Sequence, residues 1–159
     1  MLRDGGNIEN VTFANLHINT RMFSDQWWGE GEAICVTAID RKQNHKAGHI
    51  RNLRFENIDC CGENGIFLHG SADNPLEDIS LRGVRVHMKK QTQWPLRQWD
   101  LRPCEAPGLV PGKPHGLTCV YGKGIRCEDV RISHDANMEE WLDGQDFFWQ
   151  DTEDIVIHD

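Results

Sequence analysis

A short pattern that recurs five times constrains the fold of this 159-residue chain more than any other feature. Each copy begins with Asn or Asp and continues with alternating apolar and polar residues. The clearest copy runs from Gly48 to Cys60. Alternation with a period of two is typical of a strand with one buried face. The residues that begin the five copies are Asn10, Asn52, Asp78, Asp129 and Asp154.

A second position in each copy predicts a sharp bend. Four residues after the first apolar residue, every copy has a residue of the types that most readily take a positive φ angle. These residues are Asn15, Asn57, Gly83, His134 and Asp159. We therefore predict a left-handed residue between two short strands. We also expect the Asn and Asp side chains that begin the copies to stack as a hydrogen-bonded ladder.

A third apolar segment precedes three of the copies. It comprises Ala33–Thr37, Gly65–His69 and Gly116–Val120. Three short strands per unit predict an all-β chain that folds as a single-stranded parallel β-helix, a solenoid of about five coils, in which each coil buries its apolar side against its neighbours. An antiparallel sandwich of many short strands is the alternative. It is less favoured because a sandwich does not need five copies of one pattern.

Composition and charge narrow the class of partners. The net charge of −8 argues against a protein that binds nucleic-acid phosphates. The sequence has no run of about twenty apolar residues, which a membrane-spanning helix would need. No apolar signal segment follows Met1. The compartment stays open, with the cytoplasm favoured. The six cysteines lack metal-ligand spacing and fit reduced thiols, so we expect neither a metal nor a cofactor.

We predict one domain over residues 1–159, with loop insertions near 19–32 and 87–115 and an aromatic cap near 138–151. A ligand site is the alternative for the aromatic segment. The first copy lacks its preceding strand, so we expect the C-terminal part of a longer β-helix. An exposed N-terminal end of such a solenoid would favour self-association.

The first insertion places two adjacent aromatic residues beside acidic ones. Trp27 and Trp28 suit a platform on which a sugar ring stacks, although they also suit a plug that closes the side of the solenoid. Glu30 and Glu32 are candidate catalytic residues, because paired carboxylates hydrolyse glycosides when their separation fits. Two glutamates at this spacing are also common by chance.

The second insertion enters the same predicted sheet as the first and contains Trp94, Asp100 and Arg102. Two Trp-rich loops that lead into one sheet predict a single binding face. Arg97 and Arg102 are candidates for binding a carboxylate, although solvation or an Asp100–Arg102 contact would explain them equally well. Two histidines are further candidates, with solvent exposure as the simpler explanation. His69 is expected to point outwards from its strand, and His115 ends the insertion.

Four segments of the chain resemble the C-terminal half of bacterial glycoside hydrolase family 28, the polygalacturonase-like proteins. They are Gly6–Asn15, Trp27–Ile34, Asn64–Phe67, and Trp94-Pro95 with Asp100–Pro103. The resemblance implies a right-handed parallel β-helix and hydrolysis of pectin backbones with inversion. The family's catalytic motifs are Asn-Thr-Asp, Asp-Asp, Gly-His-Gly and Arg-Ile-Lys, and none of them stands in this sequence.

The resemblance therefore implies a chain that is inactive alone and that contributes subsites for an acidic oligo- or polysaccharide. The residues expected in those subsites are Trp27, Trp28, His69, Trp94, Asp100, Arg102 and His115. Two other hypotheses stay open. One is a non-catalytic β-solenoid that binds carbohydrate or serves as a structural module. The other is a small complete enzyme that uses Glu30 with Glu32 or another acid.

Overall fold

The computed structural model describes residues 5–41, 45–104 and 108–159. It is all-β, and its two main sheets contain only parallel pairings. The first sheet has the order β1 (Ile8–Asn19), β3 (Ile50–Gly62), β5 (Leu76–Met88), β10 (Arg126–His134) and β12 (Val156–His158), with β9 (Gly122–Lys123) also paired to β5. The second has the order β11 (Phe147–Gln150), β8 (Leu117–Val120), β4 (Asn64–His69) and β2 (Glu32–Thr37).

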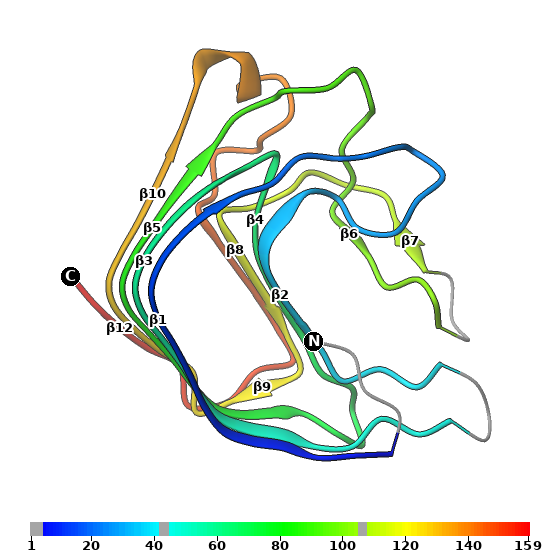
Figure 1. Ribbon diagram of the computed structural model, residues 1–159, viewed down its shortest axis with the longest axis vertical. Helices are drawn as coiled ribbons and strands as arrows, with labels where there is room; N and C mark the ends of the chain where they lie inside the picture. The colour runs from blue at the N-terminus through cyan, green and yellow to red at the C-terminus, as the bar shows by residue number, and fades with distance from the viewer. Residues whose placement is uncertain (1–4, 42–44, 105–107) are drawn as a thin grey trace.

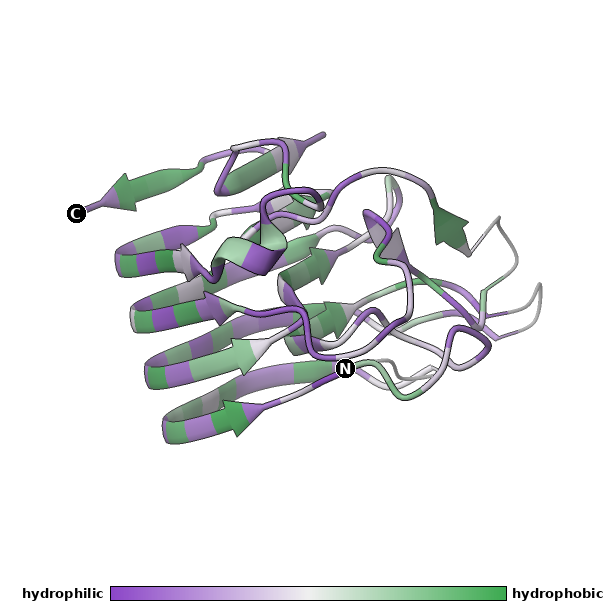
Figure 2. Ribbon diagram, turned by 90° about the horizontal axis from the view of Figure 1, so that it is seen from above, coloured by the Kyte–Doolittle hydropathy of each residue, from purple (hydrophilic) through white to green (hydrophobic). Residues whose placement is uncertain are grey.

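The chain passes from one sheet to the other and back, so that successive strands of each sheet stack side by side. Figure 1 shows the long strands of the first sheet curving around the straighter strands of the second. Figure 2 shows the same strands as stacked layers, with β1 in the lowest. Parallel neighbours need such crossovers, because a short hairpin joins only antiparallel strands. The parallel sheets and the three predicted preceding strands are confirmed.

The core lies between the two sheets and is built from the alternating apolar residues. Leu53 and Ile79 are fully buried as neighbours in register on β3 and β5. Ile66 and Leu68 of β4 enter the same core from the second sheet. Burying one Leu or Ile side chain contributes about 1.5–3 kcal/mol. The stacked apolar columns are therefore the main stabilising feature of the fold.

The layers of β1, β3, β5 and β10 each turn at two left-handed corners, although only the second was predicted, and the β12 layer has only the first, at Asp154, because Asp159 does not have the expected positive φ. At the predicted corner, Asn15, Asn57 and Gly83 have φ angles of 58°, 52° and 61°. The residues that begin the copies also have positive φ, with 57° at Asn10 and 51° at Asn52. The predicted ladder is present between these two, because Asn52 Nδ2 donates to Asn10 Oδ1 at 2.5 Å.

The register expected for the fourth copy is wrong. Asp129 was expected to begin that copy, but the neighbours of Asp129 pair with those of Gly83, so Asp129 forms the second corner, with a φ of 49°. Gly124 takes the first corner instead. The cause is a turn over residues 71–75, which the corresponding crossover after β8 lacks, since Leu76 pairs with Gly122. His134 was expected to be left-handed but lies at the end of strand β10.

The segment expected to form an aromatic cap contains a strand. Residues Phe147–Gln150 are β11, which pairs in parallel with β8. Phe147 and Trp149 pack against the core with their rings stacked, while Met138 is fully buried at the end of the 3-10 turn Ala136–Met138.

Cys60, Cys119 and Cys127 are buried thiols, and burial raises the pKa of each.

Candidate binding cleft

The first insertion meets the second beside β2. Gly29 and Gly31 have φ angles of 89° and 83°, and these left-handed turns lead the chain into the strand. They leave Trp27 61% and Trp28 56% exposed, with their ring centroids 5.8 Å apart. Exposed stacked indoles on a tightly turned loop offer a flat apolar surface to a ligand.

Glu30 holds the two insertions together. Its side chain has no exposed surface, and its carboxylate accepts hydrogen bonds from Arg97 N at 3.0 Å and Arg97 Nη1 at 3.1 Å. The Arg97 guanidinium also pairs with Asp25. Burial raises the pKa of Glu30, against the opposing effect of Arg97. These contacts occupy both oxygens of Glu30, and its side chain lies outside the cleft described below.

Asp100 makes a second link between the insertions. It lies on β6 (Trp99–Asp100), which pairs antiparallel with β7 (Leu109–Val110). Asp100 Oδ2 accepts from Gly29 N at 2.8 Å. Arg102 donates to both Asp100 oxygens, through Nε at 3.0 Å and Nη2 at 2.9 Å, and Nη2 also reaches the Trp27 carbonyl at 2.9 Å. The Asp100–Arg102 pair therefore fixes the position of the exposed tryptophans.

A cleft of about 460 Å³ opens between these two loops and the outer face of β2. Thr37 faces it because Cys35 and Thr37 alternate along β2 with the core residues Ile34 and Val36. The volume suits a small oligosaccharide segment or a similar polar ligand. The residues that line the cleft are Trp28, Gly29, Glu32, Cys35, Thr37, Arg41, Asp100, Leu101, Arg102 and Pro103.

Glu32 is the acidic residue in the cleft with an unused oxygen. Its Oε2 accepts from Glu30 N at 2.9 Å, whereas its buried Oε1 has no hydrogen-bond partner among the described residues. Burial raises the pKa of Glu32 to about 7, and the nearby Glu30 and Asp100 charges add to the effect. A carboxyl with this pKa is half protonated near neutral pH and can then donate a hydrogen bond to a ligand.

The two candidate histidines, His69 and His115, do not line the cleft. His69 does point outwards from β4, but it is only 7% exposed, because the rings of Phe67, Trp99 and Tyr121 cover it. Its Nδ1 donates to the Gly70 carbonyl at 2.6 Å, and burial lowers its pKa. His115 is 3% exposed. These rings form an apolar layer over the outer face of β4 and β8.

The structure thus brings together part of the predicted set. Trp28, Glu32, Asp100 and Arg102 meet at the cleft. Trp94 instead packs against the main core. Sequence reasoning missed Arg41 and Thr37, whose only available signal was their position in and just after the β2 segment.

His115 is separated from the cleft. Its ring stacks on Phe148 at 4.9 Å, and its Nε2 lies 3.3 Å from Asp143. Its buried Nδ1 has no partner in the described part of the chain.

Residues 5–41, 45–104 and 108–159 contain no group of three or more His, Cys, Asp or Glu side chains arranged to hold a metal ion. Across the same ranges, the structure has no helix with the length and apolar character that a membrane crossing requires. Comparison with protein-family models, curated proteins and solved structures found no match.

Proposed function

We propose that this chain is the C-terminal part of a right-handed single-stranded parallel β-helix of about five coils, with three short strands in each coil. The parallel sheets and the alternation of the chain between them support this proposal. We further propose that it belongs to a polygalacturonase-like glycoside hydrolase and binds a pectin-type acidic polysaccharide. The observation that carries the proposal is the cleft in which Trp28, Arg102 and Glu32 converge.

Each of these three side chains suits an acidic sugar. The exposed indole of Trp28 offers an apolar face on which a pyranose ring stacks. Arg102 supplies a guanidinium, the group best matched to a carboxylate. When Glu32 is protonated, it adds no negative charge to the cleft. An anionic ligand is then repelled less than when Glu32 is ionised.

The carboxylates of this chain support binding better than hydrolysis. Inverting and retaining glycosidases both need two carboxyl groups that act on the same bond. Hydrogen bonds to protein donors occupy both oxygens of Asp100 as well as those of Glu30. This leaves Glu32 as the one acid of the described cleft with a buried, unpartnered oxygen. The pair Glu30 and Glu32 is therefore a weak catalytic candidate, and we propose that the chain alone is inactive.

Tryptophan fluorescence titrated with oligogalacturonate tests the proposal. We expect a saturable change with the acidic oligomer, none with a neutral galactose oligomer, and no release of reducing sugar. Trp28→Ala should weaken binding by about tenfold, because a stacked aromatic contact contributes roughly 1 kcal/mol beyond the apolar area that it buries. Phe23→Ala is the control, since Phe23 is an exposed aromatic residue that does not line the cleft.

Absence of any fluorescence change at millimolar oligogalacturonate would count against the binding proposal. Release of reducing sugar by this chain would refute its proposed inactivity.

A non-catalytic β-solenoid module is the second candidate. Glu30 and Asp100 favour this candidate, because each carboxylate accepts hydrogen bonds that link the two insertions and is not available to act on a ligand. Equal affinity for acidic and neutral oligomers would favour this candidate over a pectin-specific site.

A further inference from the structure

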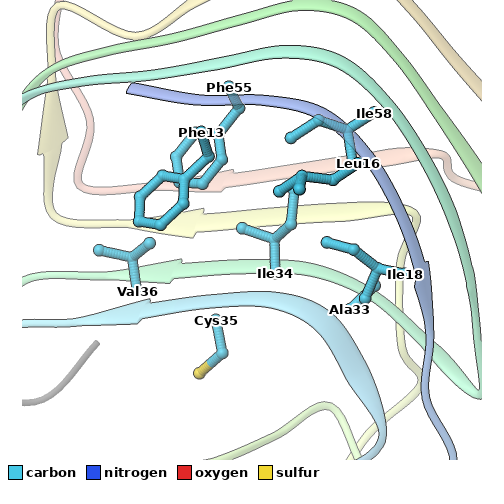
Figure 3. A pocket seen from close by; sticks show the side chains of 9 residues that line it. All are labelled: Phe13, Leu16, Ile18, Ala33, Ile34, Cys35, Val36, Phe55 and Ile58. Carbon is cyan, nitrogen blue, oxygen red and sulfur yellow. The ribbon is translucent and has the colours of Figure 1, made fainter. Parts of the chain in front are cut away.

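A row of two arginines and one serine crosses the outer face of the first sheet. Arg54 of β3 and Arg126 of β10 both pair in register with Ser80 of β5, the strand between them. Side chains alternate along a strand, so the neighbours of inward-pointing residues face outwards. Figure 3 shows Phe55, the residue after Arg54, pointing with Phe13 towards the second sheet. Arg54 and Arg126 are accordingly exposed, and Ser80 lies half-buried between them.

These two arginines differ from the other arginines of the same face, each of which has an acidic partner. The partners lie 2.8–3.3 Å apart in the pairs Arg51–Glu9, Arg82–Glu56, Arg85–Asp59 and Arg131–Asp129. Neither Arg54 nor Arg126 forms an ion pair with a residue that the structure describes. The chain has 25 acidic residues against 17 basic ones, so a shortage of acids does not explain two exposed guanidiniums without an acidic partner.

The spacing of the row allows both arginines to act on one ligand. Neighbouring strands lie about 4.8 Å apart, so the backbones of Arg54 and Arg126 flank Ser80 at about that distance on each side. Long side chains that start on both sides of a short one can bend over it. Two guanidiniums and one hydroxyl group then offer hydrogen-bond donors to a single anion above Ser80.

The set of donors favours a tetrahedral anion over a carboxylate. One guanidinium already occupies both oxygens of a carboxylate through two parallel N–H bonds. A sulfate or phosphate group has at least three acceptor oxygens, so it can accept from both guanidiniums and from the hydroxyl group. We propose that Arg54, Ser80 and Arg126 form a binding site for a sulfate or phosphate group. The core separates this site from the cleft beside β2, so the two sites are independent.

A carboxylate beside the row weakens the site. Asp78 lies two residues before Ser80 and lines the same surface hollow as Arg126. Asp78→Asn removes this negative charge, and asparagine suits the φ of 53° at this corner, because Asn52 has a φ of 51° at the same corner of the neighbouring layer. This variant should therefore bind the anion more tightly than the wild type, by about two- to fivefold.

Chemical-shift titration of the ¹⁵N-labelled chain with sodium sulfate and sodium phosphate tests this proposal, with the ionic strength held constant by sodium chloride. The amides of Arg54, Ser80 and Arg126 should shift together, with a dissociation constant of about 1 mM. Arg54→Gln and Arg126→Gln should each weaken binding by about tenfold. Arg131→Gln is the matched control, because it removes an exposed arginine from the same strand as Arg126. It should change the affinity by less than about twofold.

Two sugar esters, galactose 6-sulfate and galactose 6-phosphate, identify the source of the bound group. Tighter binding of an ester than of its free anion would assign the site to a modified sugar, and equal binding would assign it to the free anion. The proposal would be overturned if these three amides did not shift at about 50 mM sulfate or phosphate. An equal loss of affinity in Arg131→Gln, a loss in Asp78→Asn, or equally tight binding of acetate would also overturn it.

Discussion

The Glu63 carboxylate, which has no exposed surface, accepts a hydrogen bond from Lys90 Nζ at 2.9 Å. The same carboxylate accepts from the backbone N–H groups of Met22, Gln91 and Thr92. Met22 lies in the first insertion and Lys90 in the second. One buried acid at the junction of β3 and β4 therefore anchors the bases of both loops that form the cleft.

Removing the Glu63 charge should destabilise the fold. We expect Glu63→Gln to lower the free energy of unfolding by about 3 kcal/mol, because it leaves the Lys90 side chain, which is only 10% exposed, without a counter-ion and turns an amide group towards existing donors. Urea denaturation at pH 7 measures the loss. Glu56→Gln is the control, since its partner Arg82 is exposed and such surface pairs contribute less than about 1 kcal/mol. Equal losses in the two variants would contradict this role of Glu63.

Glu63 also predicts a loss of stability in acid. Burial alone would raise its pKa, but the hydrogen bonds from Lys90, Met22, Gln91 and Thr92 lower it to about 2. A depressed folded-state pKa gives stability that is present above the unfolded value of about 4.5 and is lost as the pH falls towards 2. Urea midpoints measured between pH 5 and pH 2 should fall more steeply for the wild type than for Glu63→Gln. Parallel curves would exclude this contribution.

Glu32 predicts the opposite pH dependence. Its pKa is raised to about 7, so the folded state holds a proton that the unfolded state releases above its value of 4.5. The contribution of Glu32 to stability is therefore complete below pH 4.5 and declines until the pH passes 7. Glu32→Gln should remove this decline and be more stable than the wild type at pH 8, by up to about 3 kcal/mol. A wild-type stability that does not fall over this range would argue against the buried carboxyl.

The proposed ligand should bind more weakly as Glu32 ionises. Above pH 7 the ionised Glu32 carboxylate repels the acidic ligand, so the affinity for oligogalacturonate should fall by about three- to tenfold between pH 6 and pH 8. Isothermal titration calorimetry at the two pH values measures this change. Glu32→Gln should bind with equal affinity at both. A wild-type affinity that rises with pH would contradict the repulsion proposed for Glu32.

The Asp100–Arg102 pair should matter for binding. Asp100→Asn weakens the hydrogen bonds that the Asp100 carboxylate accepts from Gly29 N and Arg102, so Trp28 loses its fixed position. We therefore expect the affinity for oligogalacturonate to fall by about tenfold. Asp129→Asn is the control, because Asp129 has an exposed partner in Arg131 and asparagine tolerates its positive φ. A binding loss as large in the control would mean that the effect is not local to the cleft.

Neither Gly65 nor Gly116 has room for a side chain, because Gly65 lies against the Gly116 backbone and Gly116 lies against the Ile132 side chain. A Cβ atom built on Gly65 would lie 2.1 Å from the Gly116 carbonyl oxygen. Gly65→Ala should therefore cost about 3 kcal/mol or more. Gly144→Ala is the control, because its added Cβ meets nothing within 4 Å and only its φ of 85° carries a cost of about 1 kcal/mol. Thermal unfolding followed by circular dichroism separates the two.

The strands were predictable because their signal is local. Alternation over β1, β3 and β5, together with Asn15, Asn57 and Gly83 at a corner, depends only on neighbouring residues. The register of the fourth copy was not predictable, because Gly124 and Asp129 both satisfy the corner pattern. Only the pairing of distant strands distinguishes them.

The candidate cleft was predicted in part for the same reason. Two Trp-rich loops that enter one sheet indicated a shared face, and Trp28 and Arg102 do meet there. The separate roles of Glu30 and Glu32 depend on Arg97, which is remote in the sequence. The role of Glu63 was not predicted, because a single glutamate between two glycine-containing strands belongs to no recognisable sequence pattern.

Stacking in parallel register has a kinetic consequence. Asn10 meets Asn52 across 42 positions of sequence, and Glu56 meets Arg82 across 26. The strands of the main sheets pair in parallel and so are not joined by tight hairpins. A long loop must therefore close before each pair of strands can form. Proteins dominated by such distant contacts refold over milliseconds to seconds. We expect this chain to collapse first and to acquire its layers slowly, one against the next.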